Sequence, residues 1–534
     1  MPGQHADRVV PPIAPASSTP CDPALLAALG DPATYGSADV EVRETHASWV
    51  FLAGDRAYKL RKPISLGFLD YSTLAMRRSA SLEEVRINEE LAPGIYLGVR
   101  AIRRGAEGFT LAAGQEPAGA VDYVVEMLRF DEADTLAGLI ASRRLTQAHL
   151  DGVARRLARF HRTAPVVPGG GVHDTLAMWR KNVRELAATG APEEWDLDTA
   201  NGFAEAFVSA HAHELELRRD TGLVRDGHGD LRCEHVLAVP PVRIVDRIEF
   251  DASLRHGDTA CDLAFLSMDL EASGQRWAAQ ALVSAYRRNG MTTGSETLLA
   301  FYAAHRALIR AKVSLIAAAE RDGDGRSQLV ARSCSLWALS ELLGWRARTP
   351  VALIICGAPA SGKSTLAAEL SRRSGIGVVS SDATRKAAAG LEATERAGPE
   401  HYSESSTLRT YELVADAAQR ALRCDGAVIV DATCHSRAER TLLAGLRGAG
   451  ITDLVVRCDV PLAVALERAR QRLHEATSVS DAGPEVVAER YRTFEPLDEL
   501  PPAGVLELDG RLPLDAQVQR VTRAVDRRLH PNSA

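Results

Sequence analysis

The first part of the chain alternates apolar and polar residues with a period of two, which is typical of half-buried β-strands. Short alternating segments follow Asp39, and Gly54-Asp55 between two of them predicts a hairpin turn. A helical segment then begins at an N-cap, Ser72, and ends before Pro93. This order predicts a small sheet with one helix laid against it, built from the strand-like segments VEVRE, SWVFL, AYKLRK, YLGVRAI, GFTLA and VDYVVEML.

From about residue 136 to residue 345 the apolar residues recur with helical spacing, as in LDGVARRLARFHR. A strand–loop–strand region at 224–251 interrupts this helical part. After residue 350 the pattern changes again, because buried strand-like runs such as VALIIC and AVIVDAT alternate with helical segments. Such alternation predicts a parallel sheet with helices on both faces. We see no internal repeat, so the two parts are expected to be different domains.

Two stretches mark the expected boundaries of the domains. Residues 1–38, which include PPIAPASSTP, are rich in Pro, Ser and Ala and are predicted to form a mobile or weakly ordered tail, with one short helix around Leu25–Leu29. Near residue 347 the segment RARTP separates an apolar helix from a buried strand, and Pro350 cannot continue a helix. We therefore expect an exposed hinge from Trp345 to Pro350.

Composition restricts the class of protein. Of the 534 residues, 46% are hydrophobic and 25% are charged, as in soluble globular proteins. The net charge of −7 argues against a sequence-independent nucleic-acid coat or an anionic membrane surface as partner. The eight cysteines include no CxxC pair, which favours reduced thiols over disulfides or a zinc site. No apolar run reaches membrane-spanning length, and the N-terminus has no hydrophobic signal core, so we expect a cytoplasmic protein.

A glycine-rich segment from Gly357 to Ser364 carries the strongest chemical signal. It fits GxxxxGK[ST], directly after a buried strand and directly before a helix. Glycines let backbone N–H groups turn toward phosphates, and the helix N-terminus adds positive potential. In this arrangement Lys363 reaches the β- and γ-phosphates, and the Ser364 hydroxyl binds Mg²⁺. The predicted nucleotide-binding residues are Gly357, Ala358, Pro359, Ala360, Ser361, Gly362, Lys363, Ser364 and Thr365.

Two acidic residues lie at the ends of other predicted strands, at the edge where open α/β sheets bind ligands. Asp431 ends AVIVD and is the candidate for orienting Mg²⁺. Asp382 ends GVVSSD and is the candidate for taking the proton of an acceptor hydroxyl, with Arg385 close to it. For both acids a helix N-cap is the open alternative. Arg468 and Arg472, one helical turn apart, form either a lid over the phosphoryl group or a solvated helix face.

The segments GAPASGKS, SSDATRK, VIVDAT and ERARQR…SDA together resemble small P-loop kinases of the polynucleotide kinase and zeta-toxin group. This resemblance covers roughly residues 350–510. It implies phosphoryl transfer to a metabolite or to a nucleic-acid end, and it leaves the acceptor open.

The N-terminal part carries a second set of candidate residues. Asp230 lies in the loop HGDL, and Asp246 ends the short strand IVD. A loop Asp that receives the acceptor's proton, followed by an Asp that holds Mg²⁺, is the order of eukaryotic-type kinases. Lys59 on a hairpin strand is the candidate partner of the α- and β-phosphates, with Glu84 on the next helix holding it. Each residue alone also fits a solvated position, so their order is what favours a kinase site.

HGDL and the later DLA at Asp262 resemble the aminoglycoside phosphotransferase family. Nearly all of the chain after residue 38 is similar to bacterial bifunctional aminoglycoside phosphotransferase/ATP-binding proteins, on ETHASWVFL, AYKLRKP, GFLDYSTL, HGDLRCEHV, VDRIEFD and DLAFLSMDL. The resemblance implies an α+β protein-kinase-like (aminoglycoside phosphotransferase-like) domain over 39–346, with a small lobe at about 39–130 and a large lobe at about 131–346. An α/β P-loop kinase domain with a parallel sheet would follow over 350–534.

The sequence departs from aminoglycoside kinases in two places. ETHAS at 44–48 replaces the GxGxxG loop, so we expect less extensive phosphate cradling there. His235 stands where those kinases have Asn, which makes it the candidate ligand of a second Mg²⁺, although oxygen ligands are preferred. Glu234 and Glu249 are candidate substitutes. A basic cluster on the helix FYAAHRALIRAKV is either an anionic-acceptor site or a salt-bridged helix face, and its members are Arg306, Arg310 and Lys312.

These features predict a bifunctional phosphotransferase that uses ATP or GTP with Mg²⁺ and acts on small-molecule hydroxyl acceptors, with no membrane partner. The charge disfavours nucleic acid and leaves a short RNA end open. The alternative is a P-loop small-molecule or nucleic-acid-end kinase whose N-terminal half is a degenerate kinase with a regulatory or substrate-binding role. His235 favours this alternative, whereas Lys59, Asp230 and Asp246 oppose it.

Overall fold

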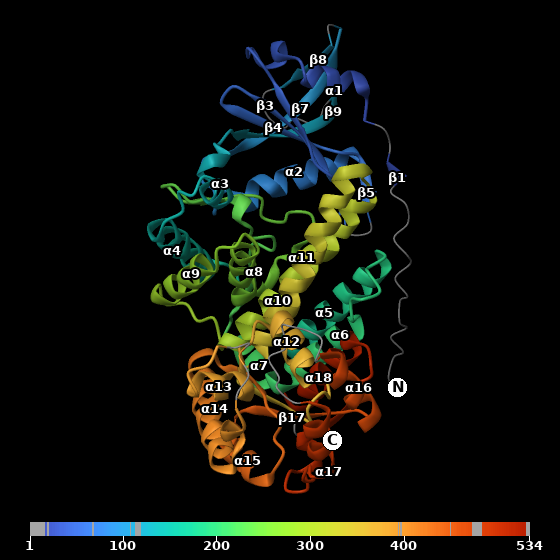
Figure 1. Cartoon of the computed structure of the whole chain (residues 1–534). Helices are drawn as coiled ribbons and strands as arrows, with labels where there is room; N and C mark the ends of the chain where they lie inside the picture. Colours follow the sequence, from blue (N-terminus) through green and yellow to red (C-terminus); the bar gives the residue numbers. More distant parts are fainter. Residues whose placement is uncertain are drawn as a thin grey trace, which may run out of the picture. The chain divides into compact units, whose positions relative to one another are not determined.

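The computed structural model describes residues 17–18, 21–66, 69–106, 108–112, 119–392, 395, 398–448, 450–472 and 483–529. By packing, the chain divides into two compact units, which are residues 1–171 with 216–294 and residues 172–215 with 295–534. Figure 1 colours the elements along the sequence. The second unit includes helices on both sides of residue 347, and the domain ranges expected from the sequence stay predictions.

Six antiparallel strands form the main sheet of the first unit. In spatial order they are β2 (Glu41–Glu44), β3 (Ser48–Ala53), β4 (Arg56–Arg61), β9 (Ala120–Leu128), β7 (Tyr96–Gly105) and β8 (Gly108–Leu111). Gly54, with a φ of +56°, makes the tight turn of the predicted hairpin between β3 and β4. Helix α2 (Leu74–Asn88) packs on β7 and β9 (Figure 1), and its N-cap is Thr73 instead of the predicted Ser72. The predicted sheet with one helix is therefore confirmed.

Part of the predicted tail is a packed helix. α1 (Pro23–Leu29) is capped by the Asp22 carboxylate, and its side chains Leu25 and Leu29 are buried in the same cluster as Phe51 of β3. The short helix predicted around Leu25–Leu29 is therefore present, and its apolar face covers part of the sheet. The weakly ordered tail expected over residues 1–38 stays a prediction. Residues 1–16 and 19–20, which include most of PPIAPASSTP, lie outside the described residues.

The remainder of the first unit is mainly helical, as expected, and short antiparallel strand pairs hold its loops. β10 (Val224–Asp226) pairs with β13 (His256–Asp258), and β11 (Val236–Leu237) pairs with β12 (Arg243–Ile244). The backbone N–H of Val245 donates to the His235 oxygen at 2.9 Å, so the two loops of the candidate site lie side by side. The other elements are β1 (Ser17–Ser18), β5 (Ile64–Leu66), β6 (Leu69–Asp70), α3 (Leu136–Ala141), α4 (Gln147–Thr163), α8 (Thr259–Ala272) and α9 (Arg276–Arg288), while α5 (Gly171–Ala188) and α7 (Ala212–Asp220) cross the unit boundaries.

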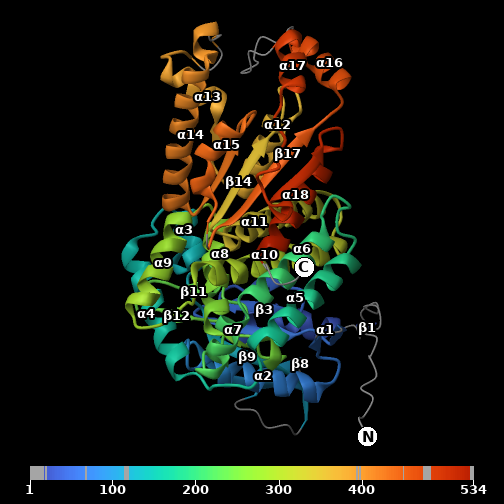
Figure 2. The same cartoon turned by 90° about the horizontal axis from the view of Figure 1, so that it is seen from below.

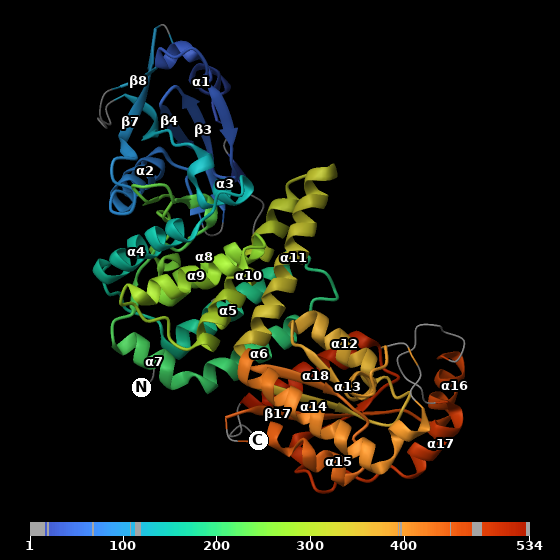
Figure 3. The same cartoon turned by 60° about the vertical axis from the view of Figure 1, so that its left-hand side comes forward.

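Long helices form the first half of the second unit. α10 (Glu296–Ala319) and α11 (Gly323–Ala347) pack along each other, as Figure 3 shows, and α6 (Leu197–Ala210) also belongs to this unit. Their core is aromatic, with Trp179 of α5 stacked on Phe301 and His305 at ring-centroid distances of 5.0 and 5.1 Å. Burial lowers the pKa of His305 to about 3, so this side chain packs as a neutral ring at pH 7.

The second half of this unit is a parallel sheet covered on both faces, which confirms the predicted architecture (Figure 2). Its strands in spatial order are β15 (Val378–Ser380), β16 (Ala427–Asp431), β14 (Val351–Cys356), β17 (Thr452–Asp459) and β18 (Val505–Asp509). Leu370 of α12 (Lys363–Ser374) and Val521 of α18 (Leu514–Leu529) are buried on one face, and Val414 of α14 (Glu404–Asp425) on the other. The remaining helices are α13 (Ser381–Ala388), α15 (Arg437–Leu442), α16 (Leu462–Arg472) and α17 (Pro484–Arg492).

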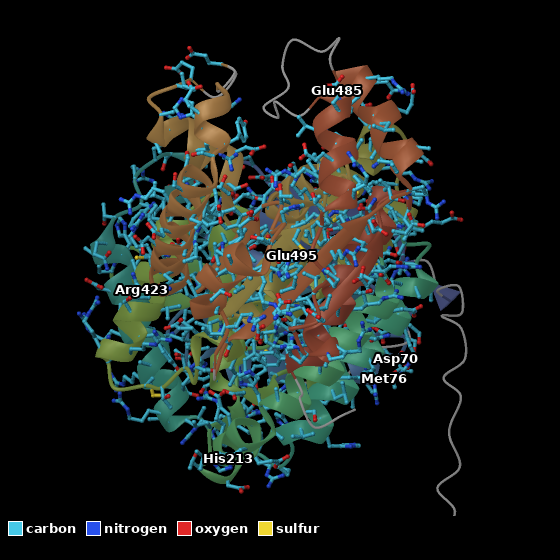
Figure 4. The ribbon with its side chains drawn as sticks, turned by 60° about the horizontal axis from the view of Figure 1, so that its bottom comes forward. Asp70, Met76, His213, Arg423, Glu485 and Glu495 are labelled. Carbon is cyan, nitrogen blue, oxygen red and sulfur yellow. The ribbon has the colours of Figure 1, made fainter. Side chains whose placement is uncertain are left out.

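The segment after α17 is held against α15 by two arginines, of which Arg440 is buried. Figure 4 labels Glu485 at the start of α17 and Glu495 in the segment that follows it. Arg440 donates to the backbone oxygens of Glu495 at 3.3 Å and Pro496 at 2.8 Å, and it also pairs with the Glu499 carboxylate. Arg437 of the same six-residue helix pairs with Asp498 at 2.6 Å, so two arginines fix the path of the chain toward β18.

The segment expected to be an exposed hinge is buried from Trp345 to Arg348 except for the half-buried Arg346, so the expected exposure is wrong there, whereas Pro350 at its end is exposed. Trp345 and Ala347 are 4% and 1% exposed, and Trp345 belongs to the core beneath the parallel sheet. Arg348 forms a bidentate ion pair with Asp526 of α18, at 2.7 and 3.0 Å, and its guanidinium lies 4.0 Å from the ring centroid of Phe203. The polar residues of RARTP suggest exposure, but the charge of Arg348 is neutralised by Asp526 inside the unit.

Replacing Arg348 with Ala is expected to destabilise the second unit by about 3–5 kcal/mol, because Asp526 would stay buried without its partner. Urea denaturation measures this loss. The matched control is Arg523→Ala, on the same helix as Asp526. Arg523 pairs with Asp196 at 3.0 Å but is 47% exposed, so we expect its loss to destabilise the unit by less than about 1 kcal/mol. A double variant, Arg348→Met with Asp526→Leu, should recover most of the stability that Arg348→Ala loses, because no unpaired charge remains buried. If it recovers none, the loss in Arg348→Ala comes from packing and not from the unpaired carboxylate.

Candidate active sites

In the first unit, three charged residues predicted from the sequence meet at one point. Lys59 of β4 donates to Glu84 Oε1 of α2 at 2.9 Å and to Asp246 Oδ1 at 3.2 Å. The period of two along β4 buries Tyr58 and Leu60 on the opposite face, so Lys59 points toward α2. Burial alone would lower the pKa of Lys59, but Asp246 and Glu84 outweigh it and hold this pKa well above its ordinary value. The positive charge of Lys59 keeps the pKa of Asp246 below its usual range, because it outweighs burial, which alone would raise that pKa.

A buried arginine that sequence reasoning missed extends this cluster. Arg61, two residues after Lys59 on the same face of β4, is 1% exposed and pairs with Glu84 and, at 2.7 Å, with Glu249 Oε1. Tyr71 also donates to Glu249 Oε1 at 2.7 Å. Glu249, a candidate metal ligand by sequence, therefore lies between a guanidinium and a phenol. The spacing of Arg61 from Lys59 could have identified it from the sequence, because residues i and i+2 of a strand share one face.

The loop HGDL is held rigidly by the Asp262 carboxylate. Asp262 accepts the backbone N–H of His228 and, at 3.0 Å, that of Gly229. The His228 ring bonds the Val245 oxygen at 2.9 Å, and burial lowers its pKa to about 4. Gly229 has a φ of +88°, and a Cβ there would lie 2.9 Å from the Leu254 oxygen, so only glycine fits. These contacts position the next residue, Asp230, which presents a side chain that is 27% exposed.

Arg232, which sequence reasoning also missed, bonds both Asp230 and His235, and His235 lies beside Asp246. Arg232 Nε donates to Asp230 Oδ2 at 2.9 Å. His235 Nε2 lies 3.5 Å from Asp246 Oδ2, and its Nδ1 is 2.8 Å from the Asp230 backbone oxygen. Asp246 has a φ of +62°, an uncommon conformation for a residue with a side chain, and its N–H donates to the Tyr96 hydroxyl.

In the second unit, the predicted phosphate-binding loop joins β14 to α12. Gly357, Ala360 and Gly362 all have positive φ, at +136°, +67° and +99°, so the loop turns sharply before the helix. A Cβ at Gly357 would lie 2.3 Å from the Cys458 oxygen, which makes glycine obligatory there. Lys363 is the first residue of α12, with Ser364 next to it. The backbone therefore has the form that places N–H groups around an anion at a helix N-terminus.

Asp431 ends β16, in the strand next to β14, and is 7% exposed. Within the described residues its Oδ1 has no hydrogen-bond partner, although it is fully buried. Burial raises the pKa of Asp431, while Lys363 and a hydrogen bond with Ser364 act against that rise. A buried carboxylate oxygen without a protein partner, beside the loop serine, fits the hard oxygen ligand set of Mg²⁺.

The other predicted residues of this site have mixed placements. Asp382 lies in the first turn of α13, behind the N-cap Ser380, and pairs with Arg385 at 2.9 Å. The Arg385 guanidinium also lies 4.6 Å from the ring centroid of Tyr402. Arg468 donates to the backbone oxygens of Ser361 at 3.4 Å and Gly510 at 2.9 Å, so it contacts the phosphate loop directly. The side chain of Arg472 and residues 480–482 lie outside the described residues.

The basic cluster on α10 is not a set of available cations. Lys312 is 8% exposed and donates to Asn182 Oδ1 at 2.7 Å, and it also pairs with Glu185. This lysine belongs to a buried polar network of the helical core, so the salt-bridged interpretation holds for it. Arg306 and Arg310 lie on the same helix and also have interaction partners.

Replacing Asp431 with Asn is expected to remove most of the Mg²⁺ dependence of nucleotide binding at the phosphate loop, because the buried ligand charge is lost. The affinity for ATP in the presence of Mg²⁺ should fall by about tenfold. Calorimetric titration with ATP, with and without Mg²⁺, measures the effect in a chain that also carries Asp246→Asn. Asp416→Asn, on the exposed side of α14, makes the same change of charge and should leave binding unchanged. Equal Mg²⁺ dependence in all three chains would contradict the assignment.

Several known proteins are similar to parts of this chain. A family model described as an AAA domain (AAA_33) matches residues 353–497, which contain the phosphate loop. The uncharacterized protein Rv2004c of Mycobacterium tuberculosis and the uncharacterized protein Mb2027c of Mycobacterium bovis are each 30% identical over 355 residues, which cover 65% of this chain and 68% of theirs.

Two solved structures show a weak similarity to parts of the chain. A choline/ethanolamine kinase family protein from Mesorhizobium loti is 16% identical, covers 60% of this chain and 97% of its own, and has a TM-score of 0.35. A gluconokinase from Sinorhizobium meliloti 1021 is 17% identical, covers 34% of this chain and 94% of its own, and has a TM-score of 0.26. None of the helices in the described part of the chain has the length and hydropathy needed to span a bilayer.

Proposed function

The chain belongs to the family of the mycobacterial protein Rv2004c, and from that premise we propose that it is an ATP-dependent phosphotransferase with two separate nucleotide sites. Each site transfers the γ-phosphoryl group to a hydroxyl of a small molecule. The observation that carries the proposal is the contact of Lys59 with both Glu84 and Asp246, in a chain that also has a phosphate loop ahead of α12. These observations support a kinase-type site in one unit and a phosphate-binding loop in the other.

At the N-terminal site, Lys59 binds the α- and β-phosphates and Glu84 keeps it in place. Asp230 accepts the proton of the acceptor hydroxyl as that oxygen bonds to the γ-phosphorus. The bond between the γ-phosphorus and the β,γ-bridging oxygen breaks, and ADP leaves with its electron pair. The rigid loop around Asp262 is what keeps Asp230 in reach of the acceptor.

At the C-terminal site, the loop N–H groups and Lys363 hold the phosphates and stabilise the charge of the transferring group. Asp382 takes the acceptor's proton, with Arg385 close to the acceptor, and Arg468 holds the loop backbone through Ser361. When bound, Mg²⁺ neutralises phosphate charge at both sites, held by Asp246 at the first and by Ser364 and Asp431 at the second.

The similarity to bifunctional aminoglycoside phosphotransferase/ATP-binding proteins supports two activities in one chain, without naming an antibiotic as acceptor. The net charge of −7 supports a small metabolite over a polynucleotide. The second candidate function, a P-loop kinase with a regulatory N-terminal half, is favoured by His235 in place of the expected Asn.

Mass spectrometry of a cell extract incubated with enzyme, ATP and Mg²⁺ tests the proposal. We expect two sets of phosphorylated products, one absent with Asp230→Ala and the other absent with Lys363→Ala. A single set that depends only on Lys363 would leave the N-terminal half as a binding module. No product dependent on either residue would refute the phosphotransferase function.

A further inference from the structure

Arg232 forms hydrogen bonds to three groups of the N-terminal site at once. Its Nε donates to Asp230 Oδ2 at 2.9 Å, one of its terminal nitrogens pairs with Glu234, and the other donates to His235 Nε2 at 2.9 Å. The side chain is 16% exposed, so this guanidinium is largely shielded from water. The charges of Asp230, Glu234 and Asp246 outweigh the effect of burial and raise the pKa of Arg232, which keeps it a permanent cation.

The hydrogen bonds of His235 fix which of its nitrogens carries the proton. The Asp230 backbone oxygen can only accept, so Nδ1, at 2.8 Å, must donate to it. A guanidinium can only donate, so Nε2 must accept from Arg232. The Nε2 lone pair is therefore directed at the Arg232 guanidinium. The same Nε2 lies 3.5 Å from Asp246 Oδ2, on the side where a second metal ligand was expected.

This arrangement does not fit a second magnesium ion. Binding to His235 would require the Nε2 lone pair that the guanidinium occupies, and Glu234, the other candidate, is paired with the same guanidinium. Glu249 is taken by Arg61 and Tyr71. An ion placed here would also meet the positive charge of Arg232 at close range.

We infer that Arg232 replaces the second magnesium ion of the N-terminal site and supplies the positive charge that faces the transferring phosphoryl group. This inference rests on the proposed function of that site. As the acceptor oxygen bonds to the γ-phosphorus and the bond to the bridging oxygen breaks, negative charge spreads over the equatorial oxygens. The proton goes to Asp230, and Arg232, already bonded to that carboxylate, balances the charge beside it. His235 acts as a positioning residue, because it holds the second terminal nitrogen.

The test counts metal ions, a readout that a merely structural role of Arg232 would not change. The parent chain carries Lys363→Ala, and binding of Mn²⁺ in the presence of the ATP analogue AMP-PNP is measured from the electron paramagnetic resonance signal of free Mn²⁺. The ions lost on adding Asp246→Asn are those of the N-terminal site. We expect one such ion in the parent chain, and two in a chain with Arg232→Ala and His235→Asn.

Two ions in the parent chain would overturn the inference and leave the proposed function intact. A count that stays at one in the double variant would also overturn it, because Arg232 would not be what excludes the second ion. No Mn²⁺ binding that depends on Asp246 would refute the nucleotide site itself, and with it the inference.

Kinetics give an independent check on the same parent chain. Phosphate release from ATP should show no further activation by free Mg²⁺ once MgATP saturates. Arg232→Ala should lower kcat by about 30-fold with AMP-PNP affinity changed less than about threefold, whereas Arg232→Lys should retain part of the activity. Equal loss in Arg232→Lys and Arg232→Ala, with unchanged fold by circular dichroism, would assign the effect to guanidinium geometry alone and overturn a role based on charge.

Discussion

Adding Asp230→Asn to a chain that already carries Lys363→Ala is expected to slow phosphoryl transfer at the N-terminal site by about 1,000-fold. The amide keeps the shape of the side chain and still accepts the hydrogen bond from Arg232, but it cannot take a proton. Because Lys59, Glu84 and Asp246 are unchanged, the affinity for MgATP should stay within about threefold of the parent chain.

Single-turnover transfer and calorimetric titration separate the two quantities. Asp220→Asn, at the exposed end of α7, is the matched control and should alter neither. Asp246→Asn should weaken Mg²⁺-dependent binding as well as transfer, since it removes charge from the metal position. If Asp230→Asn retained full transfer, another group would have to accept the proton and Asp230 would be only a partner of Arg232.

Replacing Lys363 with Ala in a chain that carries Asp230→Asn is expected to raise the barrier at the C-terminal site by on the order of 3 kcal/mol, a loss of roughly 160-fold in rate. The lysine charge at the start of α12 is the one side-chain cation that the loop motif assigns to the β- and γ-phosphates.

Steady-state release of ADP measures this loss. Arg372→Ala, near the other end of α12, removes an exposed cation that pairs with Glu369, and it should leave the rate unchanged. If total nucleotide turnover in the wild-type background did not change with Lys363→Ala, and Asp230→Ala abolished it, the C-terminal part would have a structural or sensing role instead.

The features that the sequence predicts correctly are those that depend on neighbours along the chain. The hairpin at Gly54 and the loop from Gly357 to Ser364 follow from local backbone requirements, and the structure has both. The parallel sheet follows from the alternation of buried strands with helices. Lys59, Glu84 and Asp246 could be selected because their order along the chain is that of a known type of site.

The features that the sequence does not predict depend on partners far away along the chain. The sequence RARTP indicates a polar segment, but only the fold shows that Arg348 forms an ion pair with Asp526 inside the protein. Arg61 and Arg232 are likewise ordinary basic residues until their acidic partners are placed beside them. Periodicity indicates which side chains avoid water, and it does not indicate which element covers them.

The pairing of Arg348 with Asp526 also has a consequence for how the chain is made. The two residues are 178 positions apart, which corresponds to roughly 9 to 36 s of synthesis at ordinary ribosomal rates. Throughout that interval Arg348 and the faces of α6 and α11 near it lack their partner helix α18, and a ribosome that stops before residue 526 releases a chain in which they stay uncovered. Premature termination between the candidate active sites and residue 526 should therefore mark the product for proteolysis, even though both sites have already been translated.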